Sequence, residues 1–153
     1  MKWIAFLLLG LAALVVVVAI IGSMLPRNHV ASRTMRVNRR PEDVWAAVTQ
    51  AAGSSDVPVD VIESRPPTRQ VTRVKETEKK FGGTWTIVIA PTQPPSTGSG
   101  QAACTVTITE DGWVANPIFR FVSRFVIGHH ATMDGILKRV AQAFDEEAVL
   151  TGE

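Results

Sequence analysis

An uncharged, apolar run of 23 residues, Trp3 to Leu25, constrains this chain more than any other feature of its sequence. As a helix the run would be roughly 34 Å long, against a bilayer hydrocarbon core of about 30 Å. The alternative is a cleaved signal peptide, whose shorter apolar stretch ends in a small-x-small site. Ile20 and Ile21 stand where such a site needs small residues. The run therefore predicts a transmembrane anchor over residues 1–26.

Flanking charges indicate which side of the membrane the remaining chain occupies. Lys2 precedes the apolar run, whereas five arginines follow it within residues 27–40. Because positively charged flanks stay on the cytosolic side, this asymmetry favours a single-pass protein of the cell membrane with a cytosolic domain. The arginines could also lie against anionic lipid.

Residues 27–153 have the length and composition of one globular domain. The whole chain is 46% hydrophobic and 20% charged, with a formal net charge of +2. Basic and acidic residues are nearly equal in number, which argues against nucleic-acid binding. A single cysteine, Cys104, excludes a disulfide scaffold, and three histidines without ligand spacing argue against a metal site.

Periodicity predicts an α+β domain. Alternation over 29–37 predicts a strand, and Pro41, followed by two acidic residues and later by Gly53, predicts a helix. Four more runs predict an antiparallel meander: 57–64, 68–76, 82–90 and 102–110. Residues 91–100, rich in Pro, Ser, Thr and Gly, are typical of a hairpin loop.

A long amphipathic helix is expected at the C-terminal end. It begins at Asn116-Pro117, an N-cap residue followed by proline at the first helical position. Apolar residues recur at helical spacing from Ile118 to Phe144, and the helix is expected over residues 117–147. Because a straight helix of this length would measure roughly 46 Å, a bend is expected near Gly128.

Five segments in this order carry a family resemblance. They are residues 30–48, 81–85, 107–112, 116–117 and 128–134, which include Pro-Glu-Asp-Val-Trp, Phe-Gly-Gly-Thr-Trp and Gly-His-His-Ala-Thr-Met-Asp. The chain resembles the SRPBCC superfamily, which contains START-like lipid-transfer domains and proteins labelled polyketide cyclase/dehydrase, and in particular a bacterial branch with one N-terminal membrane helix.

This resemblance implies a helix-grip fold, in which a curved antiparallel sheet wraps a long C-terminal helix. It also implies a hydrophobic cavity between sheet and helix for a lipid, polyketide or other apolar small molecule. It implies no common catalytic residues. No cofactor is expected. Relatives usually have another strand pair before the strand at 57–64, where only residues 53–56 stand here, so we expect a sheet lacking a strand pair. The cavity would then be open on one side, shrunken, or completed by another chain or the bilayer.

The candidate ligand-binding residues lie on the apolar face of the expected sheet and on the apolar stripe of the expected C-terminal helix. They are Trp85, Ile87, Cys104, Val106, Phe125, His129 and Met133. His129 is a candidate general acid/base, although a hydrogen-bonded core histidine is the more ordinary role. His130 and Asp134, one helical turn apart, are expected to pair.

Three functional hypotheses follow. The first is a membrane-tethered domain that binds a small hydrophobic or lipid-like molecule without a covalent step. The second is a cyclase- or hydratase-like enzyme that uses His129 as acid/base. The third is a structural or partner-binding module without a cavity, whose protein partner the sequence does not identify.

Overall fold

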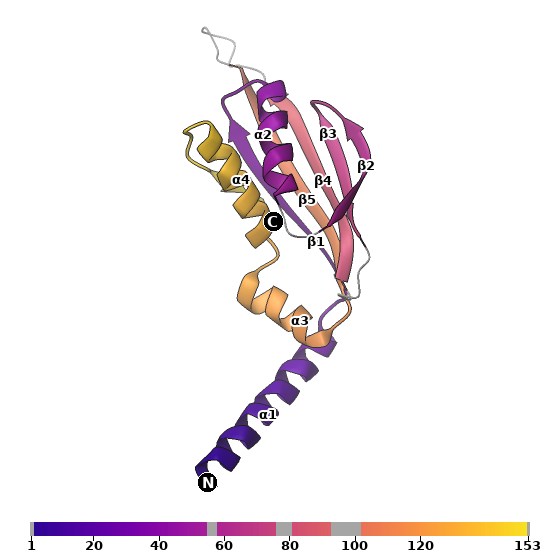
Figure 1. The fold of residues 1–153 in the computed structure, drawn as a ribbon, viewed down its shortest axis with the longest axis vertical. Helices are drawn as coiled ribbons and strands as arrows, with labels where there is room; N and C mark the ends of the chain where they lie inside the picture. The colour runs from indigo at the N-terminus through magenta and orange to yellow at the C-terminus, as the bar shows by residue number, and fades with distance from the viewer. Residues whose placement is uncertain (1, 55–57, 76–80, 93–101, 153) are drawn as a thin grey trace.

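The computed structural model describes residues 2–54, 58–75, 81–92 and 102–152 (Figure 1). The elements in chain order are α1 (Lys2–Met24), β1 (Asn28–Val37), α2 (Pro41–Gly53), β2 (Val59–Arg65), β3 (Arg69–Val74), β4 (Phe81–Thr92), β5 (Ala103–Val114), α3 (Pro117–Val122), the π-helical turn η1 (Ser123–Ile127), α4 (Ala131–Ala143) and β6 (Leu150–Thr151). Most of the hairpin loop expected at 91–100 lies outside the described residues.

The strands form one curved antiparallel sheet in the order β2-β3-β4-β5-β1-β6. The predicted α+β class, with a meander and a C-terminal helix on the sheet, is confirmed. Among the described residues no strand separates α2 from β2. The sequence did not predict β6, whose two residues pair with Thr34 and Met35 of β1.

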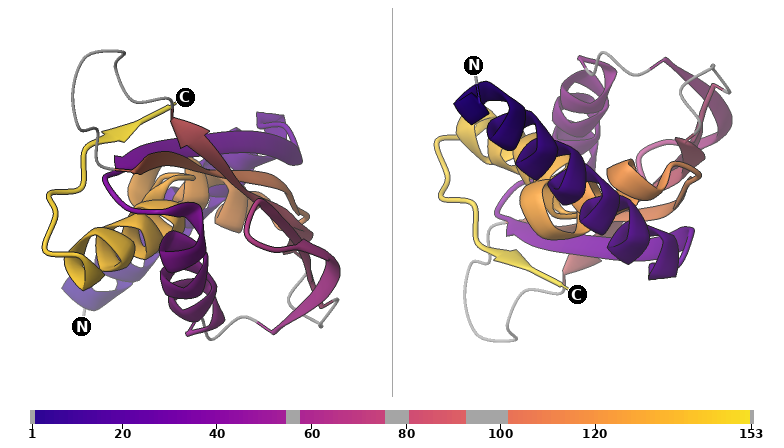
Figure 2. Two further views of the ribbon diagram at one scale, coloured as in Figure 1. Left: turned by 90° about the horizontal axis from the view of Figure 1, so that it is seen from above. Right: turned by 90° about the horizontal axis from the view of Figure 1, so that it is seen from below.

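Two helices, α2 and α4, lie on the same face of the sheet (Figures 1 and 2). Each helix contributes an apolar stripe at helical spacing. These stripes pack against the apolar side chains that alternate along the strands. The fully buried side chains of this core are Met35, Val37, Val44, Val48, Ile89, Cys104, Val106, Ile108, Met133, Ile136, Leu137 and Val140. The core thus joins both helices to β1, β4 and β5.

The opposite face of the sheet carries hydroxyl side chains that bond across strands. Thr34 and Thr107 approach to 3.0 Å, and Thr92 and Thr105 to 3.1 Å. These partly buried hydroxyls satisfy one another, so this face is stable without a covering layer of helices.

The expected long C-terminal helix is instead two helical segments. Asn116 caps α3 by accepting hydrogen bonds from the backbone of Ile118 and Phe119. The helix continues through η1 and stops at Gly128, whose φ of 79° lies in the left-handed region that glycine tolerates best. The chain therefore breaks, rather than bends gently, at the expected position. Asp134 pairs with Arg33 of β1 at 2.9 Å, not with His130.

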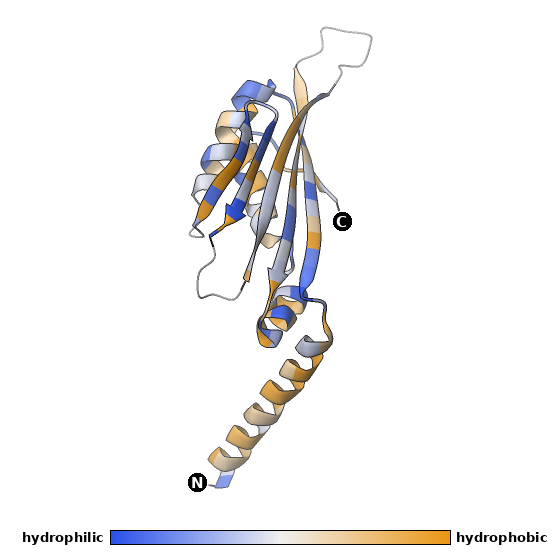
Figure 3. Cartoon of the chain, turned by 90° about the vertical axis from the view of Figure 1, so that its right-hand side faces the viewer, coloured by the Kyte–Doolittle hydropathy of each residue, from blue (hydrophilic) through white to orange (hydrophobic). Residues whose placement is uncertain are grey.

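Helix α1 projects from the domain and exposes apolar side chains along its length (Figures 1 and 3). It is long and apolar enough to cross a membrane. Its last turn packs against α3 through the buried Gly22. A β-carbon at this position would overlap the carbonyl group of Pro117, so the close approach of the two backbones requires glycine. Arg120 donates a hydrogen bond of 2.7 Å to the carbonyl oxygen of Leu25, just after the helix ends. The junction is therefore a packed contact.

Leu137 tests the packing of α4 on the sheet. Because its side chain is fully buried, Leu137→Ala should lower the free energy of unfolding by about 2–5 kcal/mol. The neighbouring Lys138 is exposed, so Lys138→Ala should change it by less than about 0.5 kcal/mol. Urea unfolding of the full chain in detergent, followed by circular dichroism, measures both. Equal effects would contradict the packing described here.

Candidate functional site

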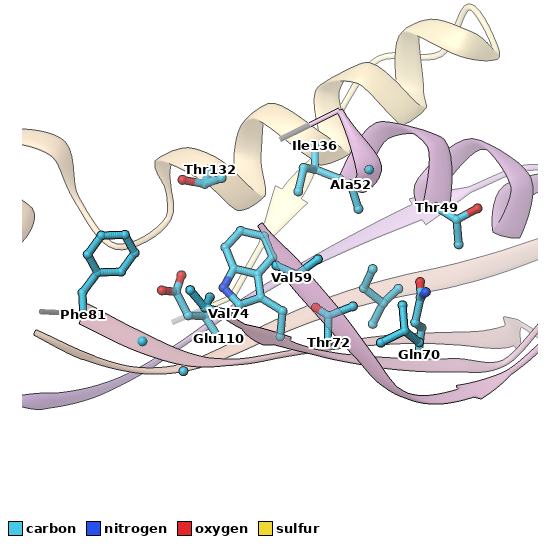
Figure 4. Close-up of a pocket in the computed structure, with 16 residues that line it drawn as sticks. Thr49, Ala52, Val59, Gln70, Thr72, Val74, Phe81, Glu110, Thr132 and Ile136 are labelled. Atoms are coloured by element: carbon cyan, nitrogen blue, oxygen red, sulfur yellow. The ribbon is translucent and has the colours of Figure 1, made fainter. Parts of the chain in front are cut away.

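A partly open cavity of about 420 Å³ lies between the sheet and the edges of α2 and α4 (Figure 4). Strands β2, β3 and β4 form its floor. The lining residues are Thr49, Ala52, Gly53, Val59, Val61, Gln70, Thr72, Val74, Phe81, Gly82, Gly83, Trp85, Ile87, Glu110, Thr132 and Ile136. The lining is mostly apolar, with a few polar side chains.

The cavity exists because the helices cover only part of the apolar face. They pack on β1, β4 and β5, whereas β2 and β3 curve away from them (Figure 2). Val59 and Val61 on β2 consequently remain exposed, although they share the apolar surface of the cavity. At the edge of α2, Ala52 and Gly53 carry little or no side chain, which leaves room above the strands.

Two glycines at the start of β4 allow β4 and β5 to come close beneath the cavity. Gly83 has a φ of 152°, and a β-carbon there would overlap the carbonyl group of Asp111. A β-carbon at Gly82 would lie 3.0 Å from the indole nitrogen of Trp113. Side chains at both positions would therefore crowd this end of the sheet.

Among the lining residues Glu110 carries the one ionisable side chain. It lies opposite Trp85 in the sheet, and its side chain is only 21% exposed. Burial raises the pKa of Glu110 above its usual range, while His29 and Trp85 act in the opposite direction. The cavity therefore holds a carboxyl group that stays protonated to a higher pH than an exposed glutamate.

His29 of β1 contacts the Glu110 side chain but does not itself line the main cavity. Its Nε2 atom lies 3.4 Å from Oε1 of Glu110. Gly112, the residue opposite His29, makes space for this contact, because a β-carbon there would lie 2.8 Å from the imidazole. The absence of a side chain at Gly112 thus positions His29 against the carboxyl group.

His129 completes a row of three titratable groups. Its ring stacks on His29 with the centroids 4.1 Å apart. Burial lowers the pKa of His129, and the nearby charges of His29, Arg124 and His130 lower it further. His129 lines a second, smaller hollow of about 160 Å³ beside Leu25 and Arg120, so it reaches the main cavity only through His29 and Glu110.

The predicted site residues divide into three groups in the structure. Trp85 and Ile87 line the cavity. Cys104 and Val106 on β5 and Met133 on α4 lie in the packed core between the sheet and the helices, and burial raises the pKa of the Cys104 thiol to about 11. Phe125 is 59% exposed in η1, and His129, as described above, borders the second hollow. Of the predicted residues, only Trp85 and Ile87 therefore belong to the lining of the main cavity.

Glu110 and His29 were missed, although alternation contained the signal. Glu110 follows Cys104, Val106 and Ile108 on the same face of β5, two residues beyond the last apolar one. His29 precedes Ala31 on the inner face of β1 in the same way. Continuing the alternation past the apolar residues would have placed both groups beside the cavity.

No model of a protein family matches the sequence, and no curated protein matches it. Among solved structures, a conserved protein from Geobacillus kaustophilus is similar at a TM-score of 0.56 and 10% identity, over 80% of this chain and 99% of that one. A truncated norcoclaurine synthase from Thalictrum flavum is similar at 0.48 and 10% identity, over 78% and 95% of the two chains. The first likeness supports the fold alone, and the second is too distant to carry an argument.

Replacing Glu110 tests the electrostatics of the cavity. A raised pKa means that the folded state favours the protonated carboxyl, so the stability it contributes is present below about pH 4.5 and is lost as the pH rises through the folded-state value. Glu110→Gln, which does not titrate, should match the wild type at pH 4 and melt at a higher temperature at pH 7.

The control is Glu147→Gln, because Glu147 is exposed and is not among the residues that line the cavity. Thermal melting followed by circular dichroism at both pH values compares the three proteins. Should Glu110→Gln melt below the wild type at pH 7, the contact with His29 would outweigh the burial of the carboxylate.

Proposed function

We propose that this protein is a membrane-tethered domain that binds a small hydrophobic or lipid-like molecule. The observation that carries the proposal is the cavity of about 420 Å³ and its mostly apolar lining. Ligand sites in proteins typically have volumes of about 300–1,000 Å³, apolar walls and a few polar groups that orient the ligand. The cavity favours this function over a structural module that lacks one.

The polar groups of the cavity are unevenly placed. Glu110 and Thr132 lie at one end, Thr72 lies in the middle, and Thr49 and Gln70 lie towards the other end (Figure 4). An elongated, mainly apolar molecule with polar groups towards its ends fits this arrangement. A hydroxyl or amine at the Glu110 end could donate a hydrogen bond to the carboxyl group.

Helix α1 supports the tether. It satisfies the length and composition of a membrane span, and the domain's arginines follow it directly. A span would hold the cavity close to the bilayer and raise the local concentration of a lipid-like ligand. We place the protein in the cell membrane as a single-pass chain, with the domain on the cytosolic side as the flanking charges favour. The resemblance to the SRPBCC superfamily agrees with this type of ligand.

A variant that fills the cavity tests the proposal. Thr72 lines the cavity on β3, whereas its neighbour Arg73 is exposed on the opposite face. Thr72→Trp should exclude the ligand, and Arg73→Trp adds the same side chain outside the cavity. Full-length proteins are purified in detergent, denatured and extracted, and the released apolar molecules are measured by mass spectrometry. We expect at least a tenfold loss of one molecule from Thr72→Trp only.

Lipids that merely coat α1 will be equal in the three samples, because none of the changes touches that helix. Circular dichroism establishes that Thr72→Trp remains folded. Identical extracts from the wild type and both variants would contradict a ligand in this cavity.

A second candidate function is acid–base catalysis on the bound molecule, in a cyclase- or hydratase-like reaction. The row Glu110, His29 and His129 favours it, because the pKa values of Glu110 and His129 are shifted and such groups near a cavity are typical of catalytic sites. In this geometry Glu110 would face the substrate, and His129 would act through His29.

The released molecule distinguishes the two functions. Under catalysis, the wild type added back to it should yield a product of changed mass or chromatographic retention, Glu110→Gln should lose at least about 99% of the activity, and His129→Gln should lose less. Under simple binding, none of the proteins alters the molecule. Liquid chromatography with mass spectrometry measures the conversion.

A further inference from the structure

Helix α3 and the turn η1 expose an apolar surface with no covering element among the described residues. Its side chains are Ile118, Phe119, Phe125, Val126 and Ile127, and the last four are between 58% and 71% exposed. We call this set the α3–η1 patch. Exposed apolar side chains are ordinary when scattered, but a concentration of five within ten residues indicates an interaction surface.

The patch is fixed beside the C-terminal end of α1. Gly22, in the last turn of α1, touches the backbone of Pro117 at the first turn of α3. Arg120 of α3 then binds the carbonyl oxygen of Leu25. Two contacts therefore set the position of α3 relative to α1.

This position defines a depth in a bilayer. If α1 spans the hydrocarbon core, Gly22 lies within about one helical turn of the end of that core, because α1 is only slightly longer than the core is thick. Pro117 touches Gly22, so α3 begins at the boundary between acyl chains and headgroups. Apolar side chains on an interfacial helix typically enter this boundary by about 5–10 Å.

Basic side chains accompany the patch. Arg27 follows α1 and lines the second hollow, where it is joined by Arg124 of η1. Neither residue takes part in an ion pair among the described residues. Guanidinium groups at this level match the phosphates of lipid headgroups.

We infer that the α3–η1 patch is a second membrane contact, embedded in the headgroup region of the bilayer that holds α1. The inference rests on the membrane tether proposed above and goes beyond it, because it adds a direct contact between the lipid and the domain to the one that α1 makes. Two contacts fix one end of the domain against the lipid.

The inference also determines which end of the cavity faces the membrane. Phe81, at the Glu110 end of the cavity, pairs with Val114, three residues before α3 begins. That end therefore lies on the membrane side of the domain, and the end near Thr49 and Gln70 lies away from it (Figures 1 and 4). A lipid-like ligand would reach the cavity from the bilayer.

Spin labels at single cysteines test the inference in the full chain. The native Cys104 is buried and is first replaced by Cys104→Ala. Labels are then placed by Val126→Cys or Phe119→Cys in the patch, by Leu14→Cys in α1 and by Lys138→Cys on the exposed face of α4. The proteins are reconstituted in vesicles of three parts phosphatidylcholine to one part phosphatidylglycerol.

Electron paramagnetic resonance measures how strongly each label is relaxed by oxygen, which concentrates in lipid, and by a water-soluble nickel chelate. We expect the oxygen-to-nickel ratio at the two patch positions to approach that at residue 14 and to exceed that at residue 138 several-fold. Circular dichroism checks the fold of each labelled protein, and agreement between positions 119 and 126 guards against a local effect of one label.

Three results would overturn the inference. Nickel access at both patch positions as high as at residue 138, with residue 14 still in lipid, would leave the tether intact and place the patch in water. Protection from both reagents would mean that protein, such as a second copy of the chain, covers the patch. Nickel access at residue 14 itself would remove the proposed tether and the inference with it.

Discussion

The chain changes direction at Gly128. The packing of α4 on the sheet and the contact between α3 and α1 both depend on this change. A left-handed glycine ends the helical run that begins at Pro117, so α4 can lie across the sheet while α3 and η1 turn towards α1. An uninterrupted helix would have to leave either the core or the junction with α1. The break lets one amphipathic sequence supply Met133 and Leu137 to the interior and leave Phe125 and Val126 outside.

The short length of α4 also explains the cavity. With only 13 residues, α4 shares the sheet with α2, and together they press on β1, β4 and β5. The curvature of β2 and β3 then leaves apolar surface that no helix reaches. Small side chains at Ala52 and Gly53 preserve the gap, and Glu110 supplies a polar group in a lining where burial makes its ionisation unfavourable.

The sequence predicted the elements better than it predicted the site. Alternation along the chain located the strands, and Pro41 and Asn116 marked two helix starts, because these signals are local. Trp85 and Ile87 were placed correctly on the inner face. Cys104 and Val106 share that face but lie under the helices, and periodicity alone cannot distinguish a core position from a cavity wall. Glu110 was overlooked because a carboxylate on an apolar face contradicts the pattern that reveals the face, and β6 is too short to produce any pattern.

The packed junction between Gly22 and Pro117 has a mechanical consequence under the proposed tethering. A helix longer than the local hydrocarbon thickness tilts to reduce hydrophobic mismatch. Arg120 and Pro117 hold the domain directly against the end of α1. A change in the tilt of α1 would therefore tilt the domain with it. Bilayer thickness would then set the angle at which the domain stands over the lipid surface.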